Sequence, residues 1–284
     1  MNHDPHLTAL PEAANSATTA DTLKQVSVLR SRGGVMQASE DVLAVEVPVG
    51  LEYNGISHVV MLASPGDLED FALGFSLSEG IIADASDLYE CEVETRPDGR
   101  LVHLKIASEH FAKLKERRRN MAGRTGCGLC GTEALDQVSR ITSAVMHRHT
   151  VNDAHLLAGM RAMQALQTLQ KQSGATHAAA WMQADGTVDC VREDVGRHNA
   201  LDKLIGALAE KKTDFSSGAL LITSRASYEM VQKAAMMNIG LVAAISAPTS
   251  FAVELAEQSG VTLIGFMRDA SYVVYAHPER LHKE

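Results

Sequence analysis

A chain of 284 residues, 45% of them hydrophobic, is long enough to bury a substantial core in one large domain or two smaller ones. Its net charge of −9 excludes a general affinity for DNA or RNA, because such binding requires a basic surface that neutralises phosphates. Four cysteines do not make a disulfide framework in a chain of this length. No run of about 18 uncharged apolar residues is present to cross a membrane.

The first residues have the composition of a tail. Residues 1–20 are rich in Ala, Ser and Thr, and they lack the basic start and apolar centre of a signal peptide. We therefore expect residues 1–22 to be a disordered tail and the protein to be cytoplasmic.

Residues 23–120 show the pattern of a small α+β domain. The runs at 26–29 and 42–47 alternate apolar with polar residues or are rich in β-branched residues, as strands are. Asn54 and Gly55 then lie between two apolar runs and predict a hairpin with a type I′ turn. The domain should therefore begin as a small sheet.

A helix and a second hairpin complete this domain. Ser64 supplies a capping hydroxyl and Pro65 a proline at the first helical position, so a helix should begin here and end near Gly80. The turn signal Arg-Pro-Asp-Gly at 96–99 joins two further strands. Cys91 falls in the first of these strands, where we expect it to be packed.

A basic helix is expected to lead into a glycine-rich segment with two cysteines. Residues 111–120 look helical, and residues 121–132 contain Cys127 and Cys130, flanked by glycines that let the backbone expose both thiols. We expect this segment to be mobile. Positive charge lowers the pKa of a thiol and attracts phosphate, although the same basic run would also serve as a solvated helix face. The basic residues near the cysteines are Lys113, Lys115, Arg117, Arg118, Arg119 and Arg124.

Three kinds of site fit the Cys127 and Cys130 pair: a structural metal site, a dithiol redox centre and a sulfur carrier. A zinc site usually takes four ligands as two close pairs, whereas Cys91 and Cys190 lie alone in predicted strands. A thioredoxin-like pair should accompany a βαβ pattern, but this pair follows a basic helix within a glycine-rich segment. A lone C-x-x-C motif does not decide among the three.

The motif fails the test for a zinc deaminase. That chemistry requires H-x-E upstream of P-C-x-x-C. Gly126 stands where the proline should be, and the only H-x-E matches begin at His277 and His282, downstream of the cysteines. Deaminase chemistry is therefore not supported.

Beyond the cysteines the pattern changes to helices and then to alternating strands and helices. Residues 133–172 should form connecting helices, including one over 152–169. Residues 173–284 predict an α/β domain in three layers, with a mostly parallel sheet covered on both faces. The expected strands are 178–182, 188–191, 219–223, 242–246, 262–266 and 272–275, and the expected helices are 198–211, 228–238 and 251–258.

Polar side chains follow three of these strands, where an open α/β sheet commonly binds its ligand. Arg197 and His198 belong to the first junction, and Ser224 and Arg225 to the second, where hydroxyls, backbone N–H groups and arginine can receive a phosphate. Residues 246–250 form the third. Helix capping explains each junction alone, but three in succession predict one nucleotide-sized site. The sequence has no Walker A motif.

Four motifs together resemble the FdhD family of formate dehydrogenase accessory proteins. They are Gly-Cys-Gly-Leu-Cys-Gly at 126–131, the segment 67–80, Asp-Val-Gly-Arg-His-Asn at 194–199 and Ser-Arg-Ala-Ser at 224–227. Their order along the chain matches the family, and the resemblance covers nearly everything after the tail. It implies a carboxyl-terminal domain with a cytidine-deaminase-like fold that lacks the zinc residues.

The resemblance also implies a function. The family is known as a sulfur carrier that acts between a cysteine desulfurase and the molybdenum (or tungsten) bis-molybdopterin guanine dinucleotide cofactor of formate dehydrogenase. Cys127 takes the persulfide role, with Cys130 as its partner, and a homodimer and no permanently bound metal are expected. The family's cofactor-contacting segment maps to Phe266, Met267, Arg268, Asp269, Ala270 and Ser271.

A rival hypothesis treats the protein as a chaperone that binds the cofactor without transferring sulfur. The cysteine pair would then serve redox sensing or stability. The two hypotheses share the cofactor and the dehydrogenase, and they differ in whether a thiol carries sulfur.

Overall fold

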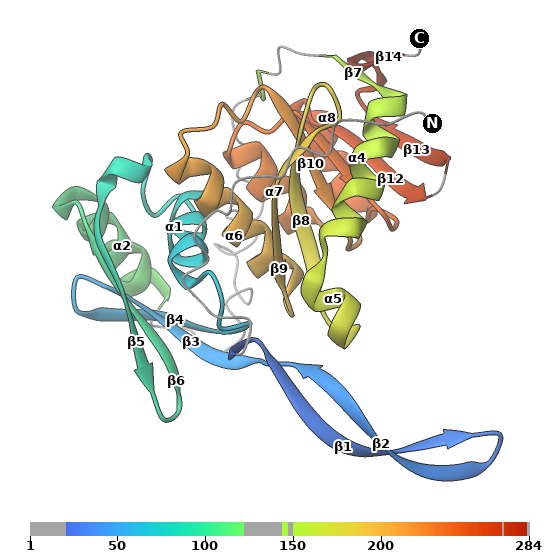
Figure 1. Cartoon of the computed structure of the whole chain (residues 1–284). Coiled ribbons are helices and arrows are strands. Elements are labelled where there is room, and N and C mark those ends of the chain that lie inside the picture. The colour runs from blue at the N-terminus through green and yellow to red at the C-terminus, as the bar shows by residue number, and fades with distance from the viewer. Residues whose placement is uncertain (1–20, 122–143, 147–149, 269, 283–284) are drawn as a thin grey trace, which may run out of the picture.

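A protruding hairpin, a four-stranded sheet and a six-stranded sheet, with their helices, make up most of the described chain (Figure 1). The computed structural model describes residues 21–121, 144–146, 150–268 and 270–282. The α/β class expected from the sequence is confirmed. None of the helices in these ranges is long and apolar enough to span a membrane.

The amino-terminal hairpin consists of β1 (Leu23–Arg32) and β2 (Val35–Ala44), which pair antiparallel along their whole length. Its turn is formed by Gly33 and Gly34, whose φ angles of 58° and 84° lie in the left-handed region that glycine enters without a steric penalty. β1 is longer than the strand predicted at 26–29, whereas the single strand predicted at 42–47 is wrong, because the chain divides it between the end of β2 and the start of β3. The hairpin extends away from the rest of the protein (Figure 1).

Two predicted segments fall largely outside the described residues. The tail predicted at 1–22 overlaps them only at its last two residues. Thr22 is buried, and its carbonyl accepts a hydrogen bond from the Val45 N–H at 2.8 Å, so this residue belongs to the fold and not to the predicted tail. The cysteine segment predicted at 121–132 lies outside them apart from Met121.

The four-stranded sheet has the order β4-β3-β6-β5. Asn54 and Gly55 form the turn between β3 and β4 with φ angles of 47° and 81°, so the predicted type I′ hairpin is confirmed. The Asn54 side chain ties this turn to β6, because it donates to the Ile106 carbonyl at 3.1 Å and accepts from the Ile106 N–H at 2.8 Å. The second predicted hairpin is confirmed as β5 and β6. The strands are β3 (Val47–Tyr53), β4 (Ile56–Ala63), β5 (Leu88–Arg96) and β6 (Gly99–Ile106).

Helix α1 (Leu68–Ser78) begins later than predicted, so the assignment of Ser64 as its cap is wrong. The residue at the cap position is Asp67, which has a φ of 53° and makes no side-chain capping bond. Ser64 is engaged by the other half of the protein: its N–H donates to Asp194 Oδ2 at 2.9 Å, and its hydroxyl accepts from the Val195 N–H at 3.2 Å. The segments that follow are η2 (Ala85–Asp87) and α2 (Ser108–Met121).

The six-stranded sheet has the order β13-β12-β11-β10-β8-β9. The expectation of a mostly parallel sheet is wrong, because within this sheet only the β10–β11 and β11–β12 pairs are parallel. Short turns join β8 to β9 and β12 to β13, and such turns force antiparallel pairing. The strands are β8 (His177–Gln183), β9 (Val188–Asp194), β10 (Gly218–Ile222), β11 (Leu241–Ala244), β12 (Thr262–Arg268) and β13 (Ser271–Ala276).

Helices cover both faces of this sheet, as predicted. On one face, α4 buries Leu156 and Met163 completely, and on the other, α6, α7 and α8 bury residues such as Leu204 and Val231. The layers are therefore helix, sheet and helix (Figure 1). The helices are α4 (Asp153–Leu166), α5 (Thr168–Ser173), α6 (Arg197–Glu210), α7 (Tyr228–Met236) and α8 (Ser250–Ser259), and the small elements are β7 (Val151–Asn152), η3 (Pro278–Arg280) and β14 (Leu281–His282).

The single helix predicted at 152–169 is wrong, because the chain breaks at Gln167 into α4 and α5. The cause is a carboxylate from β9. Glu193 is buried and accepts hydrogen bonds from the N–H groups of Leu169 at 2.9 Å and Gln170 at 2.8 Å. It thus satisfies the free N–H groups that begin a new helix.

Helices α1 and α6 cross with their backbones in contact. Gly74 of α1 lies against the carbonyl oxygen of Asp202, and Gly206 of α6 lies against the carbonyl oxygen of Asp70. A Cβ at either glycine would overlap these oxygens. One core cluster runs from the four-stranded sheet through this crossing to α6, α7 and α8, so the two predicted domains share a core.

Candidate ligand site at the carboxyl edge of the sheet

The strands β9, β10, β11 and β12 run in the same direction, so their carboxyl ends lie at one edge of the six-stranded sheet (Figure 1). A helix begins just after each of the first three strands, and a turn to β13 follows the fourth. The predicted ligand residues gather at this edge. We define the junction site by Arg197, His198, Ser224, Arg225, Ser227, Tyr228, Glu229, Phe251, Phe266 and Arg268.

Backbone hydrogen bonds hold neighbouring junctions together. The Thr249 N–H donates to the Ala226 carbonyl at 3.0 Å, which joins the start of α8 to the start of α7. The Phe266 N–H donates to the Ser246 carbonyl at 3.2 Å, which joins the end of β12 to the same region. The second and third predicted junctions and the end of β12 therefore form one continuous edge.

An ion pair joins α6 to α7 across the edge. His198 Nε2 lies 2.9 Å from Glu229 Oε2. The hydrogen bond with His198 lowers the pKa of Glu229, so this carboxylate is ionised at neutral pH. Arg197 also adds positive charge to this edge. The pKa of His177 is lowered mainly by burial and, next, by the charge of Arg197.

Two buried polar atoms at the starts of α6 and α7 have no hydrogen-bond partner in the part of the chain that the structure describes. They are Nε of Arg197 and Oγ of Ser227. Ser227 is 8% exposed and occupies the cap position of α7, yet its hydroxyl makes no capping bond. A buried polar atom without a partner costs stability and commonly marks the place of a ligand or water.

The remaining residues of the second and third junctions give this edge a mixed character. Ser224 is buried, and its hydroxyl donates to the Arg225 carbonyl at 3.0 Å, while the side chain of Arg225 is exposed. Tyr228 stacks on Phe251 with ring centroids 4.3 Å apart and planes 11° apart. Phe251 is 44% exposed, so a flat apolar surface lies beside the charged groups.

Phe266 marks the last residues of β12 as strained. Its φ of 53° lies in the left-handed region, which costs a residue with a bulky side chain about 1–3 kcal/mol. The ring is also 43% exposed. Strain of this kind is concentrated at ligand sites. The amino-acid sequence alone does not predict it, because a phenylalanine rarely adopts a positive φ.

The other residues of the predicted segment 266–271 differ in exposure. Met267 is fully buried in the core beneath α4, so its side chain is not available to a ligand. Arg268 is exposed, and its Nε donates to a backbone carbonyl at the end of β11 at 3.1 Å. Ala270 and Ser271 are exposed, and Asp269 lies outside the described residues.

Several residues of the run 192–203 fasten the two halves of the protein together. The guanidinium of Arg192 lies 2.7 Å from Asp70 of α1. Asn199 Nδ2 donates to the Leu62 carbonyl at the end of β4 at 2.8 Å. These contacts fix both ends of the turn that carries the first junction.

Two buried lysine–aspartate pairs lie inside the second half of the protein, and each also bonds to the first half, the second of them through the Ser78 hydroxyl, which donates to Asp202 Oδ1 at 2.7 Å. Lys203 Nζ lies 2.7 Å from Asp194 Oδ2, with both side chains almost completely buried, and it also donates to the Ser64 carbonyl at 3.0 Å. Lys233 Nζ lies 3.0 Å from Asp202 Oδ1. Within the run, Arg197 and His198 are therefore the basic side chains that belong to the ligand edge.

The sequence reasoning missed Glu229 and the aromatic pair of Tyr228 and Phe251. An acidic residue in the first turn of a helix is ordinary, because it complements the helix dipole. Aromatic residues at helix starts are equally unremarkable when read alone. Their role at this edge depends on α7 and α8 lying side by side, which is a property of the fold.

The cysteines divide into two groups. Burial raises the pKa of Cys91 to about 12, and it also raises the pKa of Cys190. Both are therefore thiols at neutral pH, and Cys91 packs against the core as predicted. Cys127 and Cys130 lie outside the described residues. Among the described residues, no group of three or more His, Cys, Asp or Glu side chains is placed to hold a metal ion.

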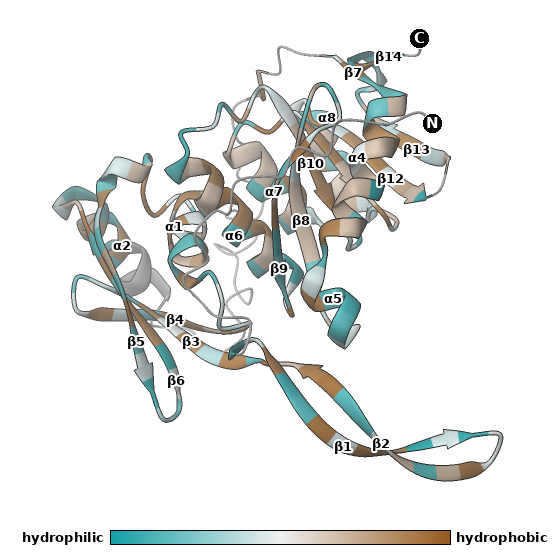
Figure 2. Cartoon of the chain, in the orientation of Figure 1, coloured by the Kyte–Doolittle hydropathy of each residue, from teal (hydrophilic) through white to brown (hydrophobic). Residues whose placement is uncertain are grey.

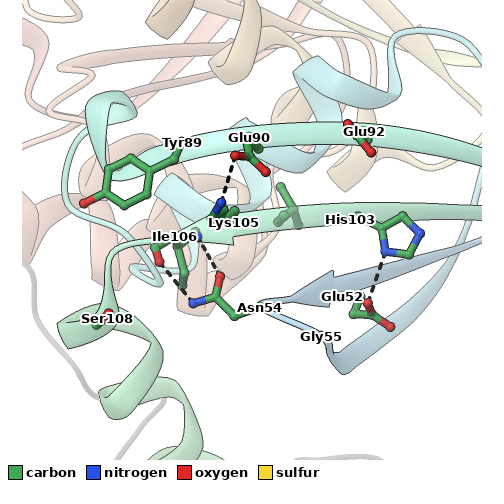
Figure 3. A pocket seen from close by; sticks show the side chains of 11 residues that line it. Glu52, Asn54, Gly55, Tyr89, Glu90, Glu92, His103, Lys105, Ile106 and Ser108 are labelled. Carbon is green, nitrogen blue, oxygen red and sulfur yellow. Dashed lines mark hydrogen bonds and ion pairs between the residues drawn. The ribbon is translucent and has the colours of Figure 1, made fainter.

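A separate pocket of about 520 Å³ lies on the four-stranded sheet (Figure 3). His103 lies between Glu94, at 3.0 Å, and Glu52, at 3.1 Å, and hydrogen bonds with these carboxylates raise its pKa. Glu90 pairs with Lys105 at 2.9 Å. The carboxylates around this pocket disfavour a phosphate-bearing ligand, unlike the cations of the junction site.

The six-stranded mixed sheet, with three helix starts and basic side chains gathered at its carboxyl edge, defines an α/β protein with one composite site at that edge. The chain belongs to the FdhD/NarQ family, whose sequence profile matches residues 44–282. The family expected from the four motifs is thereby confirmed.

Relatives agree with this assignment, and a solved structure shares the fold. The chain is 58% identical over 274 residues to the sulfur carrier protein FdhD of Cupriavidus necator strain H16, covering 96% of this chain and 95% of that protein. It is 54% identical over 257 residues to the protein of the same name from Bordetella petrii, covering 90% and 92%. A crystal structure of a protein from Desulfotalea psychrophila, described as a formate dehydrogenase accessory protein, aligns with a TM-score of 0.72 at 22% identity, covering 92% of this chain and all of that one. This last likeness concerns the fold.

Proposed function

We propose that the protein is a sulfur carrier that accepts persulfide sulfur from a cysteine desulfurase on Cys127 and transfers it to the molybdenum (or tungsten) bis-molybdopterin guanine dinucleotide cofactor, for use by formate dehydrogenase. The high identity over nearly the whole chain to proteins named sulfur carrier protein FdhD carries this proposal. The place of action would be the cytoplasm.

The distribution of the cysteines supports a role for the Cys127 and Cys130 pair. A thiolate is the form that attacks sulfur, and its availability falls as the pKa of the thiol rises. Partial burial of Cys91 and nearly complete burial of Cys190 raise the pKa of both thiols, so neither is suited to this chemistry. Of the four cysteines, Cys127 and Cys130 are therefore the candidates for sulfur transfer.

The first transfer is a displacement at sulfur. The Cys127 thiolate attacks the terminal sulfur of the desulfurase persulfide, a new S–S bond forms on Cys127, and the desulfurase cysteine leaves as a thiolate. The outer sulfur of the Cys127 persulfide would then be transferred to the metal of the cofactor: the S–S bond breaks, Cys127 leaves as a thiolate, and the reduced metal supplies the two electrons that convert the sulfane sulfur to a sulfide ligand. Cys130 is the partner thiol.

The junction site is proposed to anchor the nucleotide ends of the cofactor while sulfur is delivered. Helix starts and arginine side chains bind phosphate groups well, and this edge offers three helix starts together with Arg197, Arg225 and Arg268. The unpartnered Ser227 hydroxyl and Arg197 Nε would gain partners on binding.

Mass spectrometry of the intact protein after incubation with a cysteine desulfurase and cysteine tests this function. The wild type should gain sulfur that a reductant removes, and Cys127→Ala should gain none, because the accepting thiolate is missing. Cys91→Ala is the matched control and should load like the wild type, because the thiol it removes is buried and protonated. Loading of Cys127→Ala at the wild-type level would exclude Cys127 as the carrier.

The chaperone hypothesis makes the opposite prediction for maturation. A protein with both Cys127 and Cys130 changed to Ser should bind the cofactor but leave formate dehydrogenase inactive if sulfur transfer is the function. A fully active dehydrogenase matured by this variant would favour the chaperone instead.

A homodimer is part of the proposal, and the β1–β2 hairpin supports it. Leu29, Val35 and Met36 near the hairpin tip are 58–69% exposed, and apolar stretches run along both strands (Figure 2). A two-stranded ribbon cannot bury such residues by itself. Light scattering should give twice the monomer mass, and Met36→Ser should weaken the dimer, whereas Met146→Ser, at an equally exposed methionine elsewhere, should not. An unchanged dimer in Met36→Ser would place the interface elsewhere.

A further inference from the structure

Glu229 is an exposed carboxylate at an edge that otherwise gathers cations. Its side chain is 53% exposed, and Arg197, His198 and Arg225 belong to the same site. The contact with His198 keeps it ionised. A phosphate placed against this carboxylate would be repelled, so Glu229 suits a part of the ligand that donates hydrogen bonds.

We infer that Glu229 recognises the guanine base of a bound guanine nucleotide, and this inference rests on the proposed function because it takes that nucleotide as the ligand. Guanine carries two adjacent N–H donors, at N1 and at the 2-amino group, and a carboxylate accepts such a pair with its two oxygens. Adenine has an acceptor at N1 and no 2-amino group. Hypoxanthine keeps the N1–H but lacks the amino group.

The neighbours of Glu229 fit this assignment. His198 donates to Oε2 from α6, which fixes the direction of the side chain and leaves Oε1 and the second lone pair of Oε2 for the two donors of the base. Tyr228, the preceding residue, stacks on the half-exposed Phe251 and provides an aromatic surface on which a base can lie. At the start of α7, Glu229 and Tyr228 would thus bind the base, while Arg197 and Arg225 would bind the phosphates.

Calorimetric titration of the full chain with GDP, IDP and ADP tests the inference. The wild type should bind GDP more tightly than IDP and ADP by about tenfold or more, because loss of a paired donor leaves the carboxylate unsatisfied. Glu229→Gln replaces one acceptor by a donor and should weaken GDP binding by about 10- to 100-fold while changing ADP binding less than about threefold. Glu254→Gln, at an exposed glutamate of α8, is the matched control and should bind like the wild type.

The outcomes separate this inference from the function on which it rests. If Glu229→Gln keeps the wild-type preference for GDP over IDP, Glu229 has no part in base recognition, and the proposed function is untouched. If the wild type fails to bind GDP, the proposed anchoring of the nucleotide fails first. Glu229→Asp, which retains the carboxylate, should bind GDP more weakly but still prefer it to ADP; loss of that preference would also overturn the inference.

Discussion

Gly74→Ala is expected to lose more than about 3 kcal/mol of unfolding free energy, at or beyond the upper end of ordinary overpacking. The added methyl group would overlap the carbonyl oxygen of Asp202, and the backbone of α6 cannot move aside without breaking its own helix. Gly206→Ala should behave alike, because its Cβ would overlap the carbonyl oxygen of Asp70. Urea denaturation followed by circular dichroism measures the loss.

Gly174→Ala is the matched control for this prediction. Gly174 has a φ of 68° but meets no atom within 4 Å at the Cβ position. Its substitution should cost only the left-handed strain, about 1 kcal/mol. If Gly74→Ala and Gly174→Ala lost similar amounts, the close crossing of α1 and α6 would not be the reason for the glycine.

Lys203→Met is expected to destabilise the protein by about 3–5 kcal/mol, because it leaves the carboxylate of Asp194 buried without its cation. The two side chains are 1% and 0% exposed, so water cannot replace the lost partner. The Ser64 carbonyl would also lose a hydrogen bond at 3.0 Å. Thermal and urea unfolding of the purified variant measure the effect.

Two further variants isolate the cause. Lys211→Met removes an exposed lysine at the end of the same helix and should change the free energy of unfolding by less than about 0.5 kcal/mol. Asp194→Asn combined with Lys203→Met removes the uncompensated charge and should recover part of the loss. A double variant less stable than Lys203→Met would show that Asp194 acts mainly through its other hydrogen bonds.

The features that the sequence predicted are those that local chemistry decides. The turn at Asn54 and Gly55 follows from two residues that tolerate positive φ. The three junctions follow from the alternation of strands and helices, because helices that follow strands of one direction begin at one edge. The packing of Cys91 follows from its place in a strand where it alternates with exposed glutamates.

The features that were missed depend on distant residues. Ser64 lies 130 residues before Asp194, whose carboxylate engages it in place of the helix start. The break at Gln167 depends on Glu193 of β9. Strand direction is also invisible to a hydrophobic pattern, which has the same period in parallel and antiparallel sheets.

The dual use of the run 192–203 bears on how genetic variants of this protein should be understood. Arg192 and Asn199 join the two halves of the molecule. Arg197 and His198, which lie between these two residues in the sequence, belong to the ligand edge. Loss of stability lowers the steady-state amount of a protein in the cell. Inactive alleles at Arg192 or Asn199 should therefore be scarce on an immunoblot, and inactive alleles at Arg197 or His198 should be abundant, although the four positions lie within a few residues of one another.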